Sequence, residues 1–389
     1  MTKHKSHDVA VIGAGVFGAW TAYYLRKSGA TVTLVDAYGP ANSRASSGGE
    51  SRIIRMGYGA DQIYTRWSLR ALPRWKDLFS EAGRPELFQP TGVLWIAHNK
   101  YRYALDTLTA LQDHNVPHER LSLLGLRKHY PQISFDEDAW GIFEPDSGVL
   151  MARRAVQTLV EQARKIGVDY RPAAVLAPEG TSKINSLKTT DGDTISASTF
   201  VFACGSWLAK MFPEVLGDRI FTSRQEIFFF GIPSNESRFA PRALPTWLSL
   251  KDEFYGMPDL ESRGFKVADD RHGARVDPDT QSRVPTPEAL EAAQKFVARR
   301  FPSLKNAPVL ETRVCQYENT SNGDFLIDRH PQWDKIWLVG GGSGHGFKHG
   351  PSLGEYVAAR VTETKAAKNE IEPRFSLATK QTMQKRSVH

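Results

Sequence analysis

Hydrophobic and polar positions near the N-terminus alternate as expected for a strand, a turn, a helix and a second strand. A short apolar strand at 9–12 runs into the sequence GAGVFG at 13–18, which turns the chain into a helix. The helix ends at Gly29, and the following strand, TVTLV, ends at Asp36. This pattern predicts two adjacent parallel strands joined by a helix.

The glycines and the acid of this segment form the fingerprint of a dinucleotide-binding turn. Gly13 permits the tight turn, Gly15 lets backbone N–H groups approach a pyrophosphate, and Gly18 lets helix and strand pack closely. Asp36 is placed to accept a hydrogen bond from a ribose, which argues against NADP but leaves NAD and FAD open. The cofactor-binding residues predicted here are Gly13, Gly15, Val16, Phe17, Gly18 and Asp36.

A second glycine cluster, DKIWLVGGGSGHGFKHGPSLGEYVAARVTE, predicts a strand at 336–339, a loop to Gly350 and a helix with Pro351 in its first turn. An NAD dehydrogenase needs one such loop, whereas a flavoprotein has use for a second, because reduced flavin carries negative charge. The alternative is a generic glycine loop. In the sequence TFVFACGSWLAKMF we expect Cys204 to lie in an apolar strand and to serve packing alone.

Strand-like runs elsewhere, TGVLWIAH at 91–98 and RQEIFFFGI at 224–232, indicate a second, mixed sheet. A chain of 389 residues suits two domains. We predict an α/β fold in which a Rossmann-like cofactor domain is interleaved with an α+β substrate domain. The predicted boundaries are 1–84, 145–222 and 312–389 for the cofactor domain and 85–144 and 223–311 for the substrate domain.

Composition excludes several classes of protein. The net charge of +7 is dispersed, with its clearest cluster in the tail at 380–389, so we expect no nucleic-acid partner. No apolar run reaches the roughly 18 residues of a membrane span. The N-terminus passes from a polar stub into a strand, so we expect no signal peptide and no membrane partner. With two cysteines the chain suits a reducing compartment, and we expect a cytoplasmic protein without a metal site.

Four further motifs, taken with the N-terminal fingerprint, carry a specific resemblance. They are SSGGESRIIRMGYG at 46–59, RGFKVADD at 263–270, RVCQYENT at 313–320 and GGSGHGFK at 341–348. In this order they resemble the monomeric sarcosine oxidase family, which includes N-methyltryptophan, pipecolate and fructosyl-amino-acid oxidases. The resemblance covers almost the whole chain, although residues 85–250 match only in outline.

The resemblance implies FAD attached through a thioether to Cys315. Considered alone, a cysteine in a strand is usually structural. The resemblance also implies that Lys266 activates dioxygen and that Arg52 lies beside the flavin. Further cofactor contacts implied by the family are Ser46, Ser47, Arg52, Val175, Gly344, His345, Gly346, Phe347 and Lys348.

For the substrate, the resemblance implies that Arg55 and Lys348 bind a carboxylate and that Tyr255 and Tyr317 line the cavity. The alternative for these cations is a place on the surface, but Arg52 and Arg55 flank an apolar pair and Lys348 follows a glycine loop. Considered alone, Tyr255 is as well explained by packing.

One departure from the family pattern concerns Asp270, which stands where the family has histidine. A carboxylate there would attract a cationic amine and raise the pKa of a bound ammonium. This argues against sarcosine itself and favours a larger or more basic secondary amino acid. A solvated loop residue is the open alternative.

The reaction implied by the resemblance is oxidation of a secondary or N-alkylated amino acid to an imine, with dioxygen as electron acceptor and hydrogen peroxide as product. We expect a monomer. Two alternatives stay open: a flavin dehydrogenase that uses another acceptor, and a tRNA-modifying flavoprotein, against which the dispersed charge argues.

Overall fold

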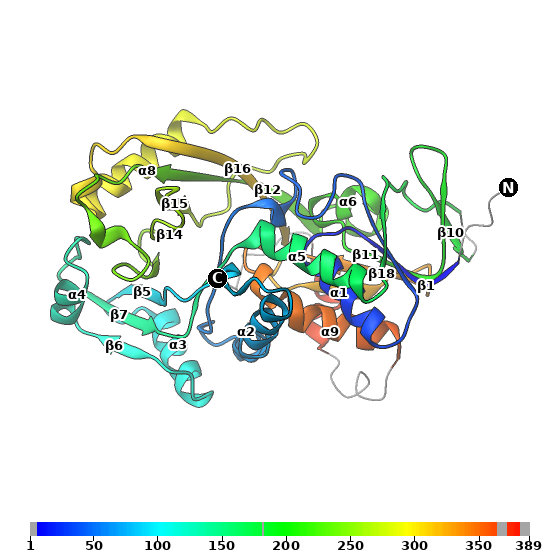
Figure 1. The fold of residues 1–389 in the computed structure, drawn as a ribbon, viewed down its shortest axis with the longest axis horizontal. Coiled ribbons are helices and arrows are strands. Elements are labelled where there is room, and N and C mark those ends of the chain that lie inside the picture. The colour runs from blue at the N-terminus through cyan, green and yellow to red at the C-terminus, as the bar shows by residue number, and fades with distance from the viewer. Residues whose placement is uncertain (1–5, 181–182, 364–371, 382–389) are drawn as a thin grey trace.

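The computed structural model describes residues 6–180, 183–363 and 372–381, so most of the basic tail lies outside the described residues. Figure 1 shows an elongated molecule with a sheet in each half and a bundle of helices beside one of them. Within the described residues, no helix combines the length and apolar character needed to cross a membrane.

A seven-stranded sheet occupies one half of the molecule. Its order is β17-β18-β11-β1-β2-β9, with β10 paired to β11, and the strands from β18 to β9 are parallel. The strands are β1 (His7–Ile12), β2 (Val32–Asp36), β9 (Asp169–Pro172), β10 (Ser186–Lys188), β11 (Thr194–Phe202), β17 (Leu326–Arg329) and β18 (Ile336–Gly340). The two strands predicted near the N-terminus and the strand before the second glycine cluster are therefore confirmed.

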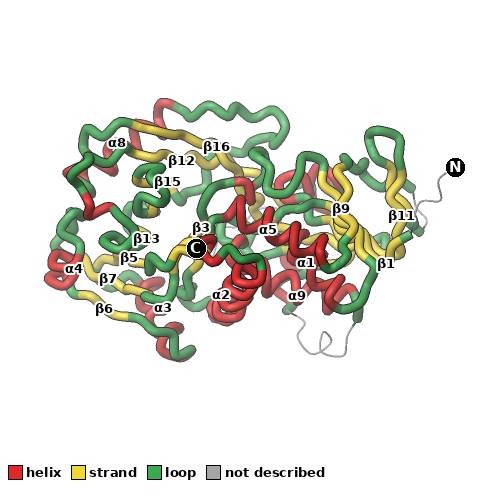
Figure 2. The backbone as a smooth tube through the Cα atoms, in the orientation of Figure 1, coloured by secondary structure: helices red, strands yellow, loops and turns green. Residues whose placement is uncertain are grey.

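Helices gather beside this sheet, as Figure 2 shows in red. Helix α1 packs against both α9 and α5, and α9 also contacts α2. Gly354 of α9 allows this approach, because a Cβ there would lie 2.6 Å from the Trp20 backbone. The helices are α1 (Val16–Lys27), α2 (Gln62–Glu81), α5 (Ala152–Lys165), α6 (Leu208–Met211), α7 (Pro213–Leu216) and α9 (Gly350–Val361).

An eight-stranded sheet forms the other half, in the order β16-β12-β15-β14-β13-β5-β7-β6. It is mixed, as predicted, because β13 and β5 are parallel whereas the other neighbours are antiparallel. Its strands are β5 (Val93–His98), β6 (Glu119–Leu121), β7 (Ala139–Glu144), β12 (Ile220–Phe230), β13 (Thr246–Ser249), β14 (Phe254–Met257), β15 (Phe265–Asp269) and β16 (Val309–Thr320).

The remaining elements connect or cover the two sheets. Strands β3 (Arg52–Ile54), β8 (Gly148–Leu150) and β4 (Phe88–Gln89) form a small antiparallel sheet. Helices α3 (Arg102–Asp113), α4 (Leu123–His129) and α8 (Pro287–Arg300) belong to the half with the eight-stranded sheet. Aromatic side chains pack α8 onto this sheet, with Phe254 and Phe296 stacked at 4.3 Å between ring centroids.

Strands β12 and β16 pair along their length and carry the large sheet toward the helical half. The predicted domain boundaries after residues 222 and 311 fall inside these two strands. The two-sheet α/β architecture agrees with the predicted fold class, while the exact division into domains stays a prediction.

Candidate active site

The first glycine turn follows β1 and opens helix α1. Gly13 has a φ of +108°, which side-chain-bearing residues rarely adopt, and a Cβ there would strike the carbonyl oxygen of Ala203. A Cβ on Gly18 would strike the Gly13 oxygen, so this glycine lets α1 lie against the turn. At the start of α1, Val16 N–H donates to Ser47 Oγ over 3.1 Å. The turn has the backbone conformation and packing that the fingerprint predicts.

Asp36 ends β2 beside this turn. Its carboxylate accepts hydrogen bonds from the N–H groups of Ala14 (2.8 Å), Tyr38 (2.9 Å) and Gly39 (2.8 Å). Burial raises the pKa of Asp36, and the three N–H groups oppose that rise. Asp36 borders a cavity together with Val175, which was also predicted to contact the cofactor.

Three compartments adjoin one another, beginning with the cavity that Asp36 borders, which we call the Asp36 compartment. The Asp36 compartment and a middle compartment share Ser46 and Ser47 in their walls. The middle compartment and an Asp270 compartment share Arg52 and Tyr317. Residues from both sheets and both glycine turns therefore border these three adjoining compartments, which together are called the cleft.

Cys204 differs from its prediction. β11 ends at Phe202, and Cys204 follows it, because the chain turns away at Gly205, whose φ is +53°. The Cys204 side chain does pack against the apolar core, but it also borders the Asp36 compartment. Burial raises the pKa of its thiol well above the usual range. The predicted packing role is therefore retained, whereas the predicted place within a strand is wrong.

The second glycine loop, residues 341–346, is held by residues of β16. Ser343 N–H donates to the Glu318 carbonyl oxygen over 2.8 Å, and Thr320 N–H donates to Ser343 Oγ over 3.2 Å. Gly344 has a φ of +80°, and a Cβ there would lie 2.8 Å from the ring of Tyr317. The loop thus presents backbone to the middle compartment, and the helix predicted after it begins at Gly350 with a proline in its first turn.

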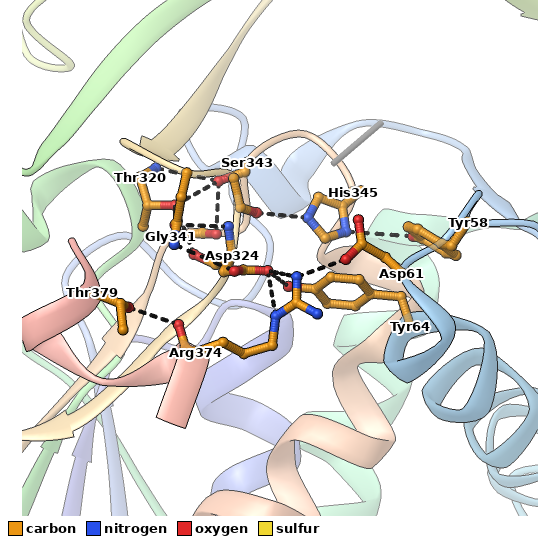
Figure 3. Close-up of polar contacts among 12 residues, drawn as sticks. Tyr58, Asp61, Tyr64, Thr320, Asp324, Gly341, Ser343, His345, Arg374 and Thr379 are labelled. Carbon is orange, nitrogen blue, oxygen red and sulfur yellow. Dashed lines mark hydrogen bonds and ion pairs between the residues drawn. The ribbon is translucent and has the colours of Figure 1, made fainter. Parts of the chain in front are cut away.

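Figure 3 shows how the α2 side of the molecule braces this loop. Tyr64 OH donates to Asp324 Oδ1 over 2.7 Å, and Arg374 pairs with both Asp324 (2.7 Å) and Asp61 (2.8 Å). His345 Nε2 lies 2.9 Å from the carbonyl oxygen of Gly323. The loop therefore rests on a layer of polar contacts made by buried and half-buried side chains.

Arg52 begins β3 and borders the middle and Asp270 compartments. Its guanidinium donates to the carbonyl oxygens of Ser46 (2.6 Å) and Ser51 (2.8 Å), and its Nη2 lies 3.6 Å from Cys315 Sγ. Cys315 is 3% exposed in β16 and is not one of the residues that border the compartments. Alternate residues of a strand face the same side, so Cys315 faces the same way as Tyr317, which does border them.

Lys266 lies in β15 and is 3% exposed. Its Nζ donates to the carbonyl oxygen (3.2 Å) and to the Oγ (3.1 Å) of Ser51, a residue of the Asp270 compartment. Burial lowers the pKa of Lys266 well below its usual value, and the positive charge of Arg52 lowers it further. Lys266 and Arg52 thus both donate to the Ser51 carbonyl oxygen, Arg52 from the compartment wall and Lys266 from behind it.

Arg55 and Lys348 border the Asp270 compartment and converge on Tyr58. The Arg55 guanidinium lies 4.2 Å from the Tyr58 ring and 4.5 Å from the Trp95 ring, and it donates to the Gly57 carbonyl oxygen. Lys348 Nζ donates to Tyr58 OH over 2.7 Å. Both predicted carboxylate-binding cations are buried, and they border the Asp270 compartment together with Arg52 and the acid Asp270.

Two tyrosines and an acid complete this compartment. Tyr255 OH and Tyr317 OH lie 3.4 Å apart, and burial raises the pKa of Tyr255 to about 12 and that of Tyr317 well above its usual value. Asp270 follows β15, and its N–H donates to the Glu253 carbonyl oxygen over 2.7 Å. Asp270 is half-buried and borders the compartment, so it is not a fully solvated loop residue, while its contact with a substrate stays a prediction.

Comparisons with known proteins agree with this arrangement. Residues 8–360 match the family described as FAD dependent oxidoreductase. The chain belongs to this family. It is 30% identical over 368 residues to monomeric sarcosine oxidase of Bacillus sp. (strain NS-129), covering 92% of this chain and 93% of that protein. It is 32% identical over 360 residues to peroxisomal sarcosine oxidase of Homo sapiens, covering 90% of each chain.

Among solved structures, fructosyl peptide oxidase from E. terrenum has the same fold, with a TM-score of 0.80 at 19% identity, covering 97% of this chain and 93% of that one. The resemblance on which the sequence prediction rests is therefore confirmed, as are the fold class and the oxidoreductase class.

The cleft of this FAD-dependent oxidoreductase fits its cofactor. Gly15 exposes bare backbone to the Asp36 and middle compartments at the start of α1, where a pyrophosphate is favoured. Asp36 offers a carboxylate for ribose hydroxyls, and the loop around Gly344 offers backbone for a planar ring. Of the predicted cofactor residues, Gly18 and Cys315 lie behind the walls of the compartments.

Three residues of the site were not singled out from the sequence. Ser51 holds Lys266, Tyr58 joins Arg55 to Lys348, and Glu318 borders the middle compartment. The first two lie inside the motif at 46–59, next to Arg52 and near Arg55. Glu318 carried a signal of its own, since it is a charge near the end of the otherwise uncharged stretch VCQYENT.

Proposed function

We propose that this enzyme oxidises a secondary or N-alkylated amino acid to an imine, with dioxygen as electron acceptor and hydrogen peroxide as product. The observation that carries this proposal is the positive lining of the Asp270 compartment. Arg52, Arg55 and Lys348 border it beside the second glycine loop. Similarity to sarcosine oxidases supports it. When bound, FAD supplies the two-electron chemistry that the side chains of the protein lack.

Arg55 and Lys348 bind the substrate carboxylate in this proposal. A guanidinium and an ammonium, both buried and borne on separate elements, suit the two oxygens of one carboxylate. Tyr58 holds the Lys348 ammonium by a 2.7 Å hydrogen bond, which orients it before substrate arrives. Binding the carboxylate to Arg55 and Lys348 fixes the position of the substrate amine relative to the second glycine loop.

Asp270 discriminates among amino acids in this proposal. Its carboxylate borders the same compartment as Arg55, so a substrate with a second basic group gains an ion pair there. We therefore expect a larger or more basic secondary amino acid to be preferred over sarcosine.

Lys266 promotes the reaction with dioxygen. A buried positive charge near Arg52 stabilises the negative charge that develops on dioxygen as it accepts electrons. Because burial lowers the pKa of Lys266, the rate of reoxidation should fall as pH rises through that lowered value. A Lys266→Met variant should lose this pH dependence.

Cys315 is the proposed tether of the cofactor. The thioether joins its Sγ to the 8α carbon of the flavin and removes one hydrogen from the thiol and one from the methyl group. The two hydrogens, which amount to two electrons and two protons, pass to dioxygen and give hydrogen peroxide. Support comes from the 3.6 Å contact between Cys315 Sγ and Arg52 and from the orientation that Cys315 shares with Tyr317.

A screen for peroxide release with N-methyl and cyclic amino acids, including basic ones, tests the reaction. Peroxide from such substrates supports the proposal. Turnover seen only with an artificial electron acceptor would show a dehydrogenase instead, and no turnover with either would contradict the substrate class. Lys266→Met should slow reoxidation far more than reduction by substrate, and equal slowing would count against its role.

Acid precipitation tests the tether. Yellow colour should stay with the precipitated protein and should be released from the Cys315→Ala variant. Release from the unaltered protein would rule out the covalent bond while leaving the proposed reaction intact. The proposed monomeric state is tested separately by sedimentation of the holoenzyme.

A further inference from the structure

Glu318 is a buried acid in the wall of the middle compartment. It lies near the end of β16, directly after Tyr317, and its side chain is 6% exposed. The same wall contains Gly15 at the start of α1 and Gly342 of the second glycine loop. Glu318 is thus placed between the two turns that frame the cofactor.

The Glu318 carboxyl lacks a hydrogen-bond donor for one of its two oxygens. Its Oε1 has no hydrogen-bond partner within the part of the chain that the structure describes. Burial raises the pKa of Glu318 to about 7, although the N–H groups of Gly341 and Gly342 favour its ionised form. A buried polar group without a full set of partners is costly, so such a residue in a binding cleft points to a ligand that supplies the missing donor.

The position of Glu318 selects which part of FAD provides that donor. The start of α1 favours the pyrophosphate, and the loop at 341–346 offers backbone to the flavin ring. The segment of FAD that joins these two groups is the ribityl chain, whose donors are hydroxyl groups. A carboxylate is repelled by phosphate but accepts strong hydrogen bonds from hydroxyls.

We propose that Glu318 binds the ribityl chain of FAD by accepting a hydrogen bond from one of its hydroxyl groups. Asp36, which is half-buried, has the equivalent task at the ribose end, so each sugar-like segment of the cofactor meets one carboxylate. The inference depends on the membership of this chain in the FAD dependent oxidoreductase family. It does not depend on which amine is oxidised.

Binding of FAD to the full-length apoprotein tests this assignment, measured through quenching of flavin fluorescence. The Cys315→Ala chain is used so that FAD exchanges freely. Glu318→Leu should raise the Kd for FAD about ten- to hundred-fold, since a hydrogen bond to a charged group is lost. Glu318→Gln, which keeps size and one acceptor oxygen, should raise it less.

Analogues of FAD that each lack one ribityl hydroxyl locate the contact. With Glu318 present, one analogue should bind about ten- to hundred-fold more weakly than FAD, whereas Glu318→Leu should bind that analogue and FAD alike. Asp36→Asn is the matched control: it should weaken FAD binding while keeping full sensitivity to the missing ribityl hydroxyl. Glu311→Gln, on the same strand but paired with Arg263, should change nothing.

Unchanged Kd in both Glu318 variants would overturn the assignment. Equal sensitivity to every analogue in Glu318→Leu and its parent would do so as well, because the hydroxyl would then have another partner. Circular dichroism of each apoprotein confirms its fold, and if the leucine variant fails to fold, the comparison is made with Glu318→Gln against the same analogues.

Discussion

The two glycine turns of this oxidoreductase border the same cleft but are built in different ways. The first, at 13–18, is supported mainly by its own neighbourhood: Gly13 N–H donates to Val35 O over 2.7 Å, and Ala14 N–H to Asp36. The second, at 341–346, is held by β16. The first turn is therefore braced by β2 of its own sheet, whereas the second follows β18 of the seven-stranded sheet and is braced by β16 of the eight-stranded sheet.

Breaking the first turn should have the largest effect. In Gly18→Ala the new Cβ strikes the Gly13 carbonyl oxygen, so the turn cannot keep its conformation. We expect loss of bound flavin and a fall in the free energy of unfolding of about 3 kcal/mol. Flavin absorbance per polypeptide and denaturant unfolding measure both.

Gly125→Ala in α4 is the matched control, because its Cβ would lie 3.6 Å from the nearest side-chain atoms. There the same substitution should stabilise the protein by up to about 1 kcal/mol. If both alanine variants behaved alike, the close approach at Gly18 would not be the cause.

Weakening the distant support of the second turn should have an intermediate effect. Tyr58→Phe removes the hydroxyl that accepts from Lys348 (2.7 Å) and contacts His349 Nε2 (2.8 Å). We expect KM for the amino-acid substrate to rise about tenfold while kcat changes less, because the ammonium loses its orientation. Steady-state peroxide assays at matched flavin content measure the change.

Tyr64→Phe serves as its control, since Tyr64 OH donates to Asp324 away from the cleft. That variant should lose stability and keep its KM. A normal KM in Tyr58→Phe would show that other contacts, such as the one with the His345 carbonyl oxygen at 2.9 Å, are enough to hold Lys348.

The smallest effect is expected within the second turn itself. Ser343→Ala leaves the buried N–H of Thr320 without the acceptor it has at 3.2 Å. The free energy of unfolding of the apoprotein should fall by about 1–2 kcal/mol, with FAD still bound. Denaturant titration measures this, and an unchanged midpoint would indicate that Ser343 contributes no support to the loop.

Local sequence was enough to predict the elements that carry both turns. Glycines with positive φ, the 3.6-residue spacing of apolar positions and an acid at a strand end act over short distances, so they can be recognised without a fold. The place of Cys204 was missed for a related reason: the end of a strand depends on a turn that apolar pattern alone does not mark.

The sequence by itself determined the dinucleotide-binding fingerprint, the second glycine loop and the cations that the family resemblance assigned to the site. Only the tertiary structure decided that Tyr58 joins Arg55 to Lys348, that Ser51 holds Lys266 and that Glu318 borders the middle compartment between the turns. The Tyr58–Lys348 contact joins residues 290 positions apart, and the Ser51–Lys266 contact joins residues 215 positions apart. They arise because the register of β12 and β16 and the packing of α9 on α1 bring separate segments together, which no short-range pattern encodes.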